Sequence, residues 1–150
     1  MTTGQIVLLA AVALALGFGA WRAVADGRFR GTHQVKGAEP ESAPEPGVLH
    51  GTDIAHTLGE RATLLQFSSA FCAPCRATRR VLGEVAGLVP GVTHVEIDAE
   101  HHLELVRRVG VLRTPTTLIL DAAGREVTRA SGTPRRDEVL TTLARVAIPE

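Results

Sequence analysis

The chain has few cysteines, almost no lysine and no excess of charge. Its 150 residues include two cysteines and, among sixteen basic residues, a single lysine, and the formal net charge is zero. A balanced charge gives no indication of a nucleic-acid partner, because binding to phosphate backbones depends on clustered positive charge. The sequence also contains no nucleotide or flavin motif, so we expect no bound cofactor. The strong preference for arginine over lysine is typical of GC-rich coding DNA.

The length allows one domain with an appendage. A domain of about 100 residues can bury its own core, whereas two ordinary domains need a longer chain. Composition divides the sequence into an apolar segment over residues 1–25, a segment rich in Pro, Glu and Gly over residues 26–47, and a region of mixed pattern over residues 48–150. We expect a transmembrane anchor, a flexible linker and one folded domain, in that order.

The first segment contains an unbroken apolar run over residues 6–21. With its flanks it makes a helix of about 20 residues, which at ~1.5 Å per residue matches the ~30 Å core of a bilayer. A cleaved signal peptide is the alternative, because residues 23–25 (Ala-Val-Ala) have the form of a cleavage site. Against cleavage, the first five residues hold no Lys or Arg, and Trp21 and Arg22 separate the apolar run from that site. The pattern favours an uncleaved anchor.

The flanking charges predict the orientation of this anchor. Arg22, Arg28, Arg30 and Lys36 all follow the apolar run, whereas only the α-amino group precedes it. Because Lys and Arg near the ends of a span prefer the cytoplasmic side, we expect a single-pass protein of the cell membrane with its domain in the cytoplasm. An extracytoplasmic domain remains the alternative.

Residues 26–47 do not have the composition of a folded segment. Pro40, Pro44 and Pro46 stand among acidic and small residues, which cannot bury a core. We expect an extended tether that lets the domain move near the membrane.

Hydrophobic periodicity predicts alternating strands and helices over the remaining residues. Pro90 and Gly91 should end one helix, Gly110 should end another, and Gly124 marks a hairpin turn. The expected elements are a weak helical stretch at 53–58, a strand at 62–68, a helix at 72–89, a strand at 92–97, a helix at 100–109, strands at 116–121 and 126–130, and a last helix capped by Thr133 and Pro134.

The two cysteines, Cys72 and Cys75, lie three residues apart where the first predicted strand leads into a helix. The N-terminus of a helix carries unpaired N–H groups and the positive end of the helix dipole, so a thiol there ionises readily. We therefore expect Cys72 to be the nucleophile and Cys75, one turn along, to resolve a mixed disulfide. A zinc site would need two more ligands, and the doublet of His101 and His102 is better explained as a solvated start of a helix. We expect no metal site.

This order of elements, with a CxxC motif opening the first helix, resembles the thioredoxin fold over about residues 58–147. The resemblance rests on Cys-Ala-Pro-Cys at 72–75 followed by Arg76, on Asp98 at the end of the second strand, on Thr-Pro-Thr at 114–116, and on Gly132 before the last helix. It implies an α/β domain with a central mixed β-sheet flanked by helices. It also implies that Pro115 is cis and faces the dithiol, and that an extended substrate pairs with Thr114. The whole chain is similar to short membrane-anchored thioredoxin-like proteins of high-GC bacteria.

Two positions depart from this family beneath the dithiol. Where this chain has Gln66, thioredoxins have a buried aspartate, and that aspartate takes a proton from the resolving cysteine. A glutamine cannot act as that base. The lysine that the family pairs with it is matched here by His94. A neutral imidazole beside an amide avoids an unpaired buried charge, and His94 is either a substitute proton acceptor or a hydrogen-bonded core histidine.

Other departures lie around the dithiol. Phe71 stands where the family has tryptophan, and we expect this aromatic side chain to shield the dithiol and contact substrate. Arg76, Arg79, Arg80 and Arg113 predict a positive rim that lowers the pKa of Cys72 and favours acidic partners, although such charges are often only a solvated surface.

The sequence therefore predicts a thiol-disulfide oxidoreductase, and the proline before the second cysteine favours a reductase of protein disulfides. With no cofactor motif, its electrons should come from another protein, whose identity the sequence does not give. Two alternatives stay open: exchange outside the cytoplasm in the maturation of proteins or cytochromes, and a non-catalytic interaction module tethered to the membrane.

Overall fold

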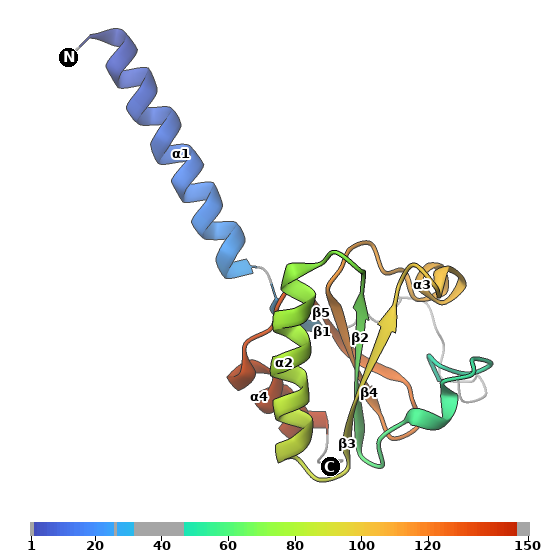
Figure 1. Ribbon diagram of the computed structural model, residues 1–150. Coiled ribbons are helices and arrows are strands. Elements are labelled where there is room, and N and C mark those ends of the chain that lie inside the picture. The colour runs from blue at the N-terminus through green and yellow to red at the C-terminus, as the bar shows by residue number, and fades with distance from the viewer. Residues whose placement is uncertain (1, 26, 32–46, 147–150) are drawn as a thin grey trace, which may run out of the picture.

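A computed structural model describes residues 2–25, 27–31 and 47–146, and the chain folds into helices on both faces of one sheet (Figure 1). The elements are α1 (Thr3–Ala25), β1 (Phe29–Gly31), the 3₁₀ turn η1 (Ala55–Thr57), β2 (Ala62–Ser68), α2 (Ala73–Leu88), β3 (Val92–Asp98), α3 (Leu103–Val109), β4 (Thr116–Asp121), β5 (Glu126–Ser131) and α4 (Arg136–Val146).

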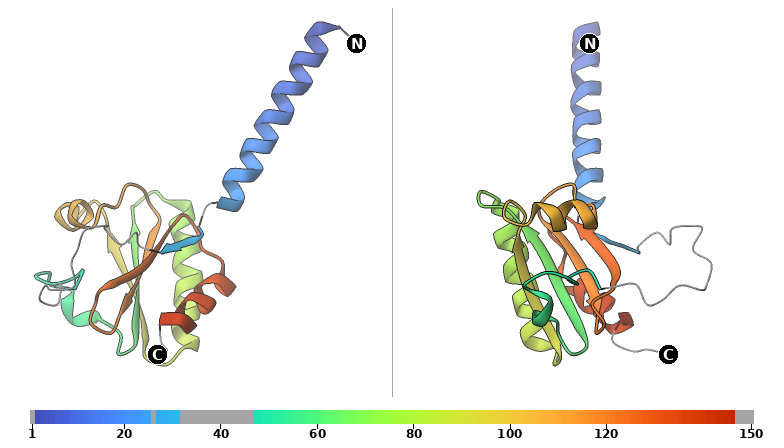
Figure 2. Two further views of the ribbon diagram at one scale, coloured as in Figure 1. Left: turned by 180° about the vertical axis from the view of Figure 1, so that it is seen from behind. Right: turned by 90° about the vertical axis from the view of Figure 1, so that its right-hand side faces the viewer.

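The sheet is mixed, with the strand order β1-β5-β4-β2-β3. Only β2 and β3 run parallel, and every other neighbouring pair is antiparallel. All seven residues of β2 are buried, because it lies between β3 and β4 and has helices over both faces. Helices α2 and α4 cover one face and α3 covers the other (Figures 1 and 2). This arrangement confirms the predicted α/β fold.

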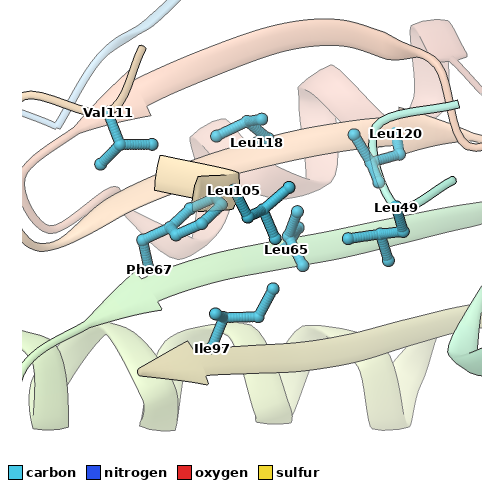
Figure 3. Close-up of a cluster of buried hydrophobic side chains, with 8 residues drawn as sticks. All are labelled: Leu49, Leu65, Phe67, Ile97, Leu105, Val111, Leu118 and Leu120. Carbon is cyan, nitrogen blue, oxygen red and sulfur yellow. The ribbon is translucent and has the colours of Figure 1, made fainter. Parts of the chain in front are cut away.

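The core is divided between the two faces of the sheet. Side chains of β2 alternate, so Leu65 and Phe67 face α3 whereas Leu64 belongs to the cluster under α2 and α4. Gln66 shares the face of Leu64 and therefore lies beneath α2. The cluster on the α3 side is drawn in Figure 3 and consists of Leu49, Leu65, Phe67, Ile97, Leu105, Val111, Leu118 and Leu120.

Strand β1 was not predicted from the sequence, and it lies inside the segment expected to be a tether. Phe29–Gly31 pairs antiparallel with β5, and the Phe29 N–H donates to Oε1 of Glu138 on α4 at 3.0 Å. The Phe29 ring packs against the core cluster under α2 and α4. These three residues belong to the sheet, so the prediction of a tether is wrong for them. Residues 26 and 32–46 of that segment lie outside the described residues.

Two helices begin later than predicted. The side chain of Asp98 accepts a hydrogen bond from the Glu100 N–H at 2.9 Å, which forms a turn, and α3 starts only at Leu103. Helix α4 starts at Arg136 and is not capped by Thr133, because the Thr133 hydroxyl lies instead against α2, 3.2 Å from Oγ1 of Thr78. The remaining strands and α2 agree with prediction to within one residue at each end.

Helix α1 is long and apolar enough to cross a membrane, by its length and composition, over Thr3–Arg22. Its described side chains are exposed and none of that stretch packs against the domain. This helix agrees with the expected anchor.

Candidate active site

The two cysteines form a disulfide at the N-terminus of α2. Cys72 is the N-cap residue, Pro74 stands in the first turn, and the Cys75 N–H donates to the Cys72 sulfur at 3.1 Å. The same N–H also donates to the Cys72 carbonyl oxygen at 3.1 Å. The Cys72 sulfur thus accepts a backbone N–H and lies at the positive end of the helix dipole, which favours a thiolate at Cys72 after reduction.

The two cysteines differ in their access to solvent. Cys75 is buried, with 2% of its surface exposed, whereas Cys72 is only partly buried. An incoming disulfide can therefore reach Cys72 but not Cys75. This asymmetry supports the predicted order, in which Cys72 attacks and Cys75 resolves.

The loop before β4 reaches the same end of the sheet. Phe67 near the end of β2 pairs with Thr116 at the start of β4, so the residues that precede Thr116 lie beside those that follow β2. Oγ of Ser69 and Oγ1 of Thr114 are 3.0 Å apart and connect the two loops. The Thr114–Pro115 bond is cis, which confirms that part of the resemblance.

Gln66 is the centre of a buried hydrogen-bond network under the dithiol. Its Nε2 donates to the Cys75 carbonyl at 3.0 Å and to the Ser68 hydroxyl at 2.8 Å. Because the amide oxygen of Gln66 can only accept, His94 donates to it through Nε2, at 3.1 Å. The structure thus brings the predicted pair of Gln66 and His94 together. Gln66 thereby holds the first turn of α2 against β2, and His94 holds the Gln66 amide.

Glu96 completes this network, and the sequence prediction missed it. The Ser68 hydroxyl donates to its Oε1 at 2.6 Å, and Arg79 of α2 donates to the same oxygen at 2.8 Å. Nε2 of Gln66 lies 3.5 Å from that oxygen. The signal that could have found Glu96 is the alternation of β3, which places it on the same face as His94.

The charge states of this network follow from its contacts. Burial lowers the pKa of His94, opposed in part by the negative charge of Glu96, so the imidazole is neutral at pH 7. Although burial acts in the opposite direction, hydrogen bonds from Arg79 and Ser68 and the nearby positive charge lower the pKa of Glu96. The glutamate is therefore an anion that is paired with Arg79. Because Arg79 is paired with Glu96, its charge does not add to the predicted positive rim. Of the predicted rim residues on α2, Arg76 and Arg80 are exposed.

The surface around the dithiol includes two exposed apolar side chains. Phe71 is fully exposed and Leu112, in the loop before the cis proline, is 96% exposed. Because the Phe71 ring contacts almost nothing, it does not shield the disulfide as predicted. Both side chains instead expose apolar surface to solvent.

The histidine doublet has other contacts. Nδ1 of His101 lies 2.9 Å from the Asp98 carboxylate, and Nδ1 of His102 lies 3.1 Å from the Asp98 carbonyl oxygen. The hydrogen bonds from Glu100 and His101 lower the pKa of Asp98. Within the described part of the chain, no group of three or more His, Cys, Asp or Glu side chains is placed to hold a metal ion.

A disulfide at the start of a helix, a neighbouring cis proline and a mixed sheet define a thiol-disulfide oxidoreductase domain. A family model described as Thioredoxin matches residues 50–145, so the chain belongs to the thioredoxin family.

Curated relatives and solved structures agree with this assignment. The thioredoxin of Chlamydia trachomatis is 26% identical over 98 residues, which is 65% of this chain and 95% of that protein. The thioredoxin of Alicyclobacillus acidocaldarius is 32% identical over 89 residues, which is 59% of this chain and 84% of that protein. A thioredoxin structure from Nicotiana alata matches with a TM-score of 0.56 and 22% identity, over 72% of this chain and 100% of that one. A mutant thioredoxin from Halobacterium salinarum matches with a TM-score of 0.56 and 20% identity, over 61% of this chain and 79% of that one. These last two likenesses concern the fold.

Proposed function

We propose that this protein is a membrane-anchored reductase of protein disulfides. The observation that carries the proposal is the unequal exposure of the two cysteines at the start of α2, because a reductase needs one accessible nucleophile and one protected resolving thiol.

The reaction begins with the reduced dithiol. The Cys72 thiolate attacks one sulfur of the partner disulfide, forms a mixed disulfide and releases the other partner sulfur as a thiolate, which takes up a proton. The Cys75 thiol then loses its proton and attacks the Cys72 sulfur. This step breaks the mixed disulfide and releases the second partner sulfur, so two electrons pass to the partner and the Cys72–Cys75 disulfide remains. A dithiol of another protein must reduce that disulfide again.

Proton transfer from Cys75 cannot use a base at position 66. We propose that His94 accepts this proton at Nδ1, because its imidazole is neutral and its Nε2 already carries the hydrogen that it donates to Gln66. Replacing His94 with Gln should then slow the release of the reduced partner and flatten the pH dependence of that step between pH 6 and 8. An unchanged rate over this range would leave His94 as a structural residue only.

The apolar helix α1 and the positive charges after it support the membrane part of the proposal. Arg22 and Arg28 follow the apolar run and are exposed, which by the positive-inside rule favours a cytoplasmic domain. The side of the membrane on which the domain lies is tested with a variant in which Cys72 and Cys75 are replaced by serine and a single cysteine is added at the C-terminus. In intact cells an impermeant thiol reagent should not label it, and rapid labelling would place the domain outside.

The reductase activity is tested by the reduction of insulin. The full-length protein in detergent, supplied with dithiothreitol, should accelerate reduction, and Cys72→Ser should abolish the acceleration. Cys75→Ser should instead accumulate a mixed disulfide with the substrate, visible on a non-reducing gel. Equal rates for the wild-type protein and Cys72→Ser would refute the reductase proposal.

A further inference from the structure

Helix α1 is joined to the folded domain almost directly. The helix ends at Ala25, and the Gly27 N–H donates to the carbonyl oxygen of Ser131, the last residue of β5, at 2.7 Å. A chain can cross the two residues from Ala25 to Gly27 over at most about 7 Å. Because β1 follows at once and is paired with β5, residues 32–46 come after the first strand of the domain and do not separate the domain from the anchor.

The point of attachment is next to the active site. The backbone of Gly27 lies against the carbonyl of Thr133, so closely that a Cβ at Gly27 would collide with it. Oγ1 of Thr133 lies 3.4 Å from the carbonyl oxygen of Pro74, which stands between the two cysteines. The neighbouring Gly132 N–H donates to the carbonyl of Pro115 at 2.8 Å. Figures 1 and 2 show the same relation, since α1 leaves the domain at the end where α2 begins.

The lengths involved hold this end of the domain close to the bilayer. The apolar run ends at Trp21, and the four further residues of α1 add about 6 Å. Gly27 therefore lies no more than about 13 Å beyond Trp21, whereas the headgroup layer outside the hydrocarbon core is about 5 to 8 Å thick. The domain has little room to move away from the surface, in contrast to the roaming domain that a long tether would allow.

The active-site surface suits a partner at the membrane. Phe71 and Leu112 are exposed apolar side chains, and Arg76 adds an exposed positive charge beside the dithiol. Apolar and basic side chains together match the border between the acyl chains and the headgroups.

We propose that the dithiol faces the bilayer and that its substrates are integral membrane proteins whose disulfide lies in a segment next to a membrane span. This inference rests on the proposed anchor and exchange activity, and it adds the substrate class and the orientation. Soluble proteins, whose disulfides lie away from the bilayer, are poorer substrates than these membrane proteins, because the active-site end of the domain is turned toward the headgroups.

Orientation is measured with a spin label on the full-length protein in nanodiscs that contain a nickel-chelating headgroup lipid. One sample carries the label at Cys72 in the Cys75→Ser variant. The control carries it at Leu88→Cys, with both native cysteines replaced by serine; Leu88 is exposed and lies at the other end of α2, about 24 Å along the helix axis. We expect several-fold stronger relaxation by nickel at Cys72 than at Leu88. Equal relaxation, or stronger relaxation at Leu88, would overturn the proposal.

A matched variant separates proximity from folding. A Gly/Ser insertion of 20 residues between Ala25 and Gly27 keeps β1 paired with β5 but gives the domain a relaxed span of about 25 Å. In detergent this variant should reduce insulin at the wild-type rate, and in nanodiscs it should lose the difference in nickel relaxation between the two labels. If the difference persists, the short connection is not its cause and the proposal fails.

Substrate choice is measured with two transmembrane peptides in the same vesicles as the full-length protein. Both carry the same disulfide loop, one directly after the span and one after a semi-rigid helical spacer of about 25 residues, roughly 40 Å. We expect several-fold faster reduction of the first peptide by the wild-type protein, and a ratio near one for the insertion variant. Equal rates of reduction of the two peptides by the wild-type protein would refute the proposed substrate class and leave the reductase activity intact. The reductase activity is tested separately, by the loss of insulin reduction in Cys72→Ser.

Discussion

Replacing Gln66 with aspartate, the residue that the family resemblance places here, should destabilise this protein at neutral pH. Gln66 is fully buried, and its Nε2 lies 3.5 Å from Oε1 of Glu96. The pKa of Glu96 is lowered by its hydrogen bonds from Arg79 and Ser68, so the glutamate is negative at pH 7. The carboxylate under the dithiol is thus supplied by β3 instead of β2, and a second one would repel it.

The size of this effect follows from the distance. An aspartate is one methylene shorter than a glutamine, which puts the two carboxylates about 5 Å apart. At an effective dielectric constant of about 20, two negative charges at that separation repel by about 3 kcal/mol. This repulsion raises the pKa of the new carboxyl group in the folded state by about two units above its ordinary value near 3.9. The decrease that this repulsion causes in the free energy of unfolding is absent below about pH 4, grows up to about pH 6 and stays constant above that value.

The assay is denaturant unfolding of residues 27–150, which contain all five strands, in the oxidised form at pH 4 and pH 8. The hydrogen bonds that Gln66→Asp removes lower the free energy of unfolding at both pH values. The informative quantity is therefore the additional decrease in this free energy at pH 8, which we expect to be about 3 kcal/mol. The double variant Gln66→Asp with Glu96→Gln moves the single carboxylate back to β2 and should recover most of this loss. Equal losses at both pH values, or a double variant no better than Gln66→Asp, would refute the reasoning.

Three further predictions concern stability. Removing residues 27–47 should lower the free energy of unfolding by about 2 to 4 kcal/mol, measured by urea titration, because it exposes the edge of β5 and uncovers the core beneath Phe29; an unchanged midpoint would show that β1 contributes nothing. Thr117→Val should stabilise the protein by about 1 kcal/mol, since Oγ1 of Thr117 is buried with no hydrogen-bond partner among the described residues; a loss of stability in a thermal melt would contradict this. Burial lowers the pKa of His94 in the folded state, so the stability that depends on its neutral form is complete above about pH 6.5, the ordinary value, and is lost as the pH falls below it toward the lowered pKa of the folded state. Unfolding at pH 7.5 and 5.5 should therefore show a smaller decline for His94→Gln than for the wild-type protein, and an identical decline would be evidence against the neutral buried imidazole.

Elements with strong local signals were predicted well. Strand β2 is continuously apolar and α2 is bounded by Cys72 and Pro90, so both agree with the structure to within a residue. The starts of α3 and α4 were wrong because side chains that normally cap helices have other partners here. Asp98 forms a turn with Glu100, and Thr133 contacts Thr78 across the domain.

Strand β1 shows a different limit of prediction. Three residues, Phe29–Gly31, are too few to have a period, and their neighbours in sequence are polar or small. They form a strand only because β5 has an unpaired edge and because Glu138 accepts the Phe29 N–H. The consequence is large, since this pairing brings the start of the folded domain to within a few residues of helix α1.

The sequence alone determined the order of the main elements, the dithiol and its likeness to thioredoxin, because these depend on local periodicity and on spacing within one turn of helix. Only the tertiary structure decided which groups surround the dithiol. Glu96 and Arg79 are 17 residues apart, and their ion pair needs both β3 and α2 to be in place. The same holds for the position of the end of helix α1 beside the dithiol, since Gly27 and Ser131 meet through a hydrogen bond between segments that are distant in the chain.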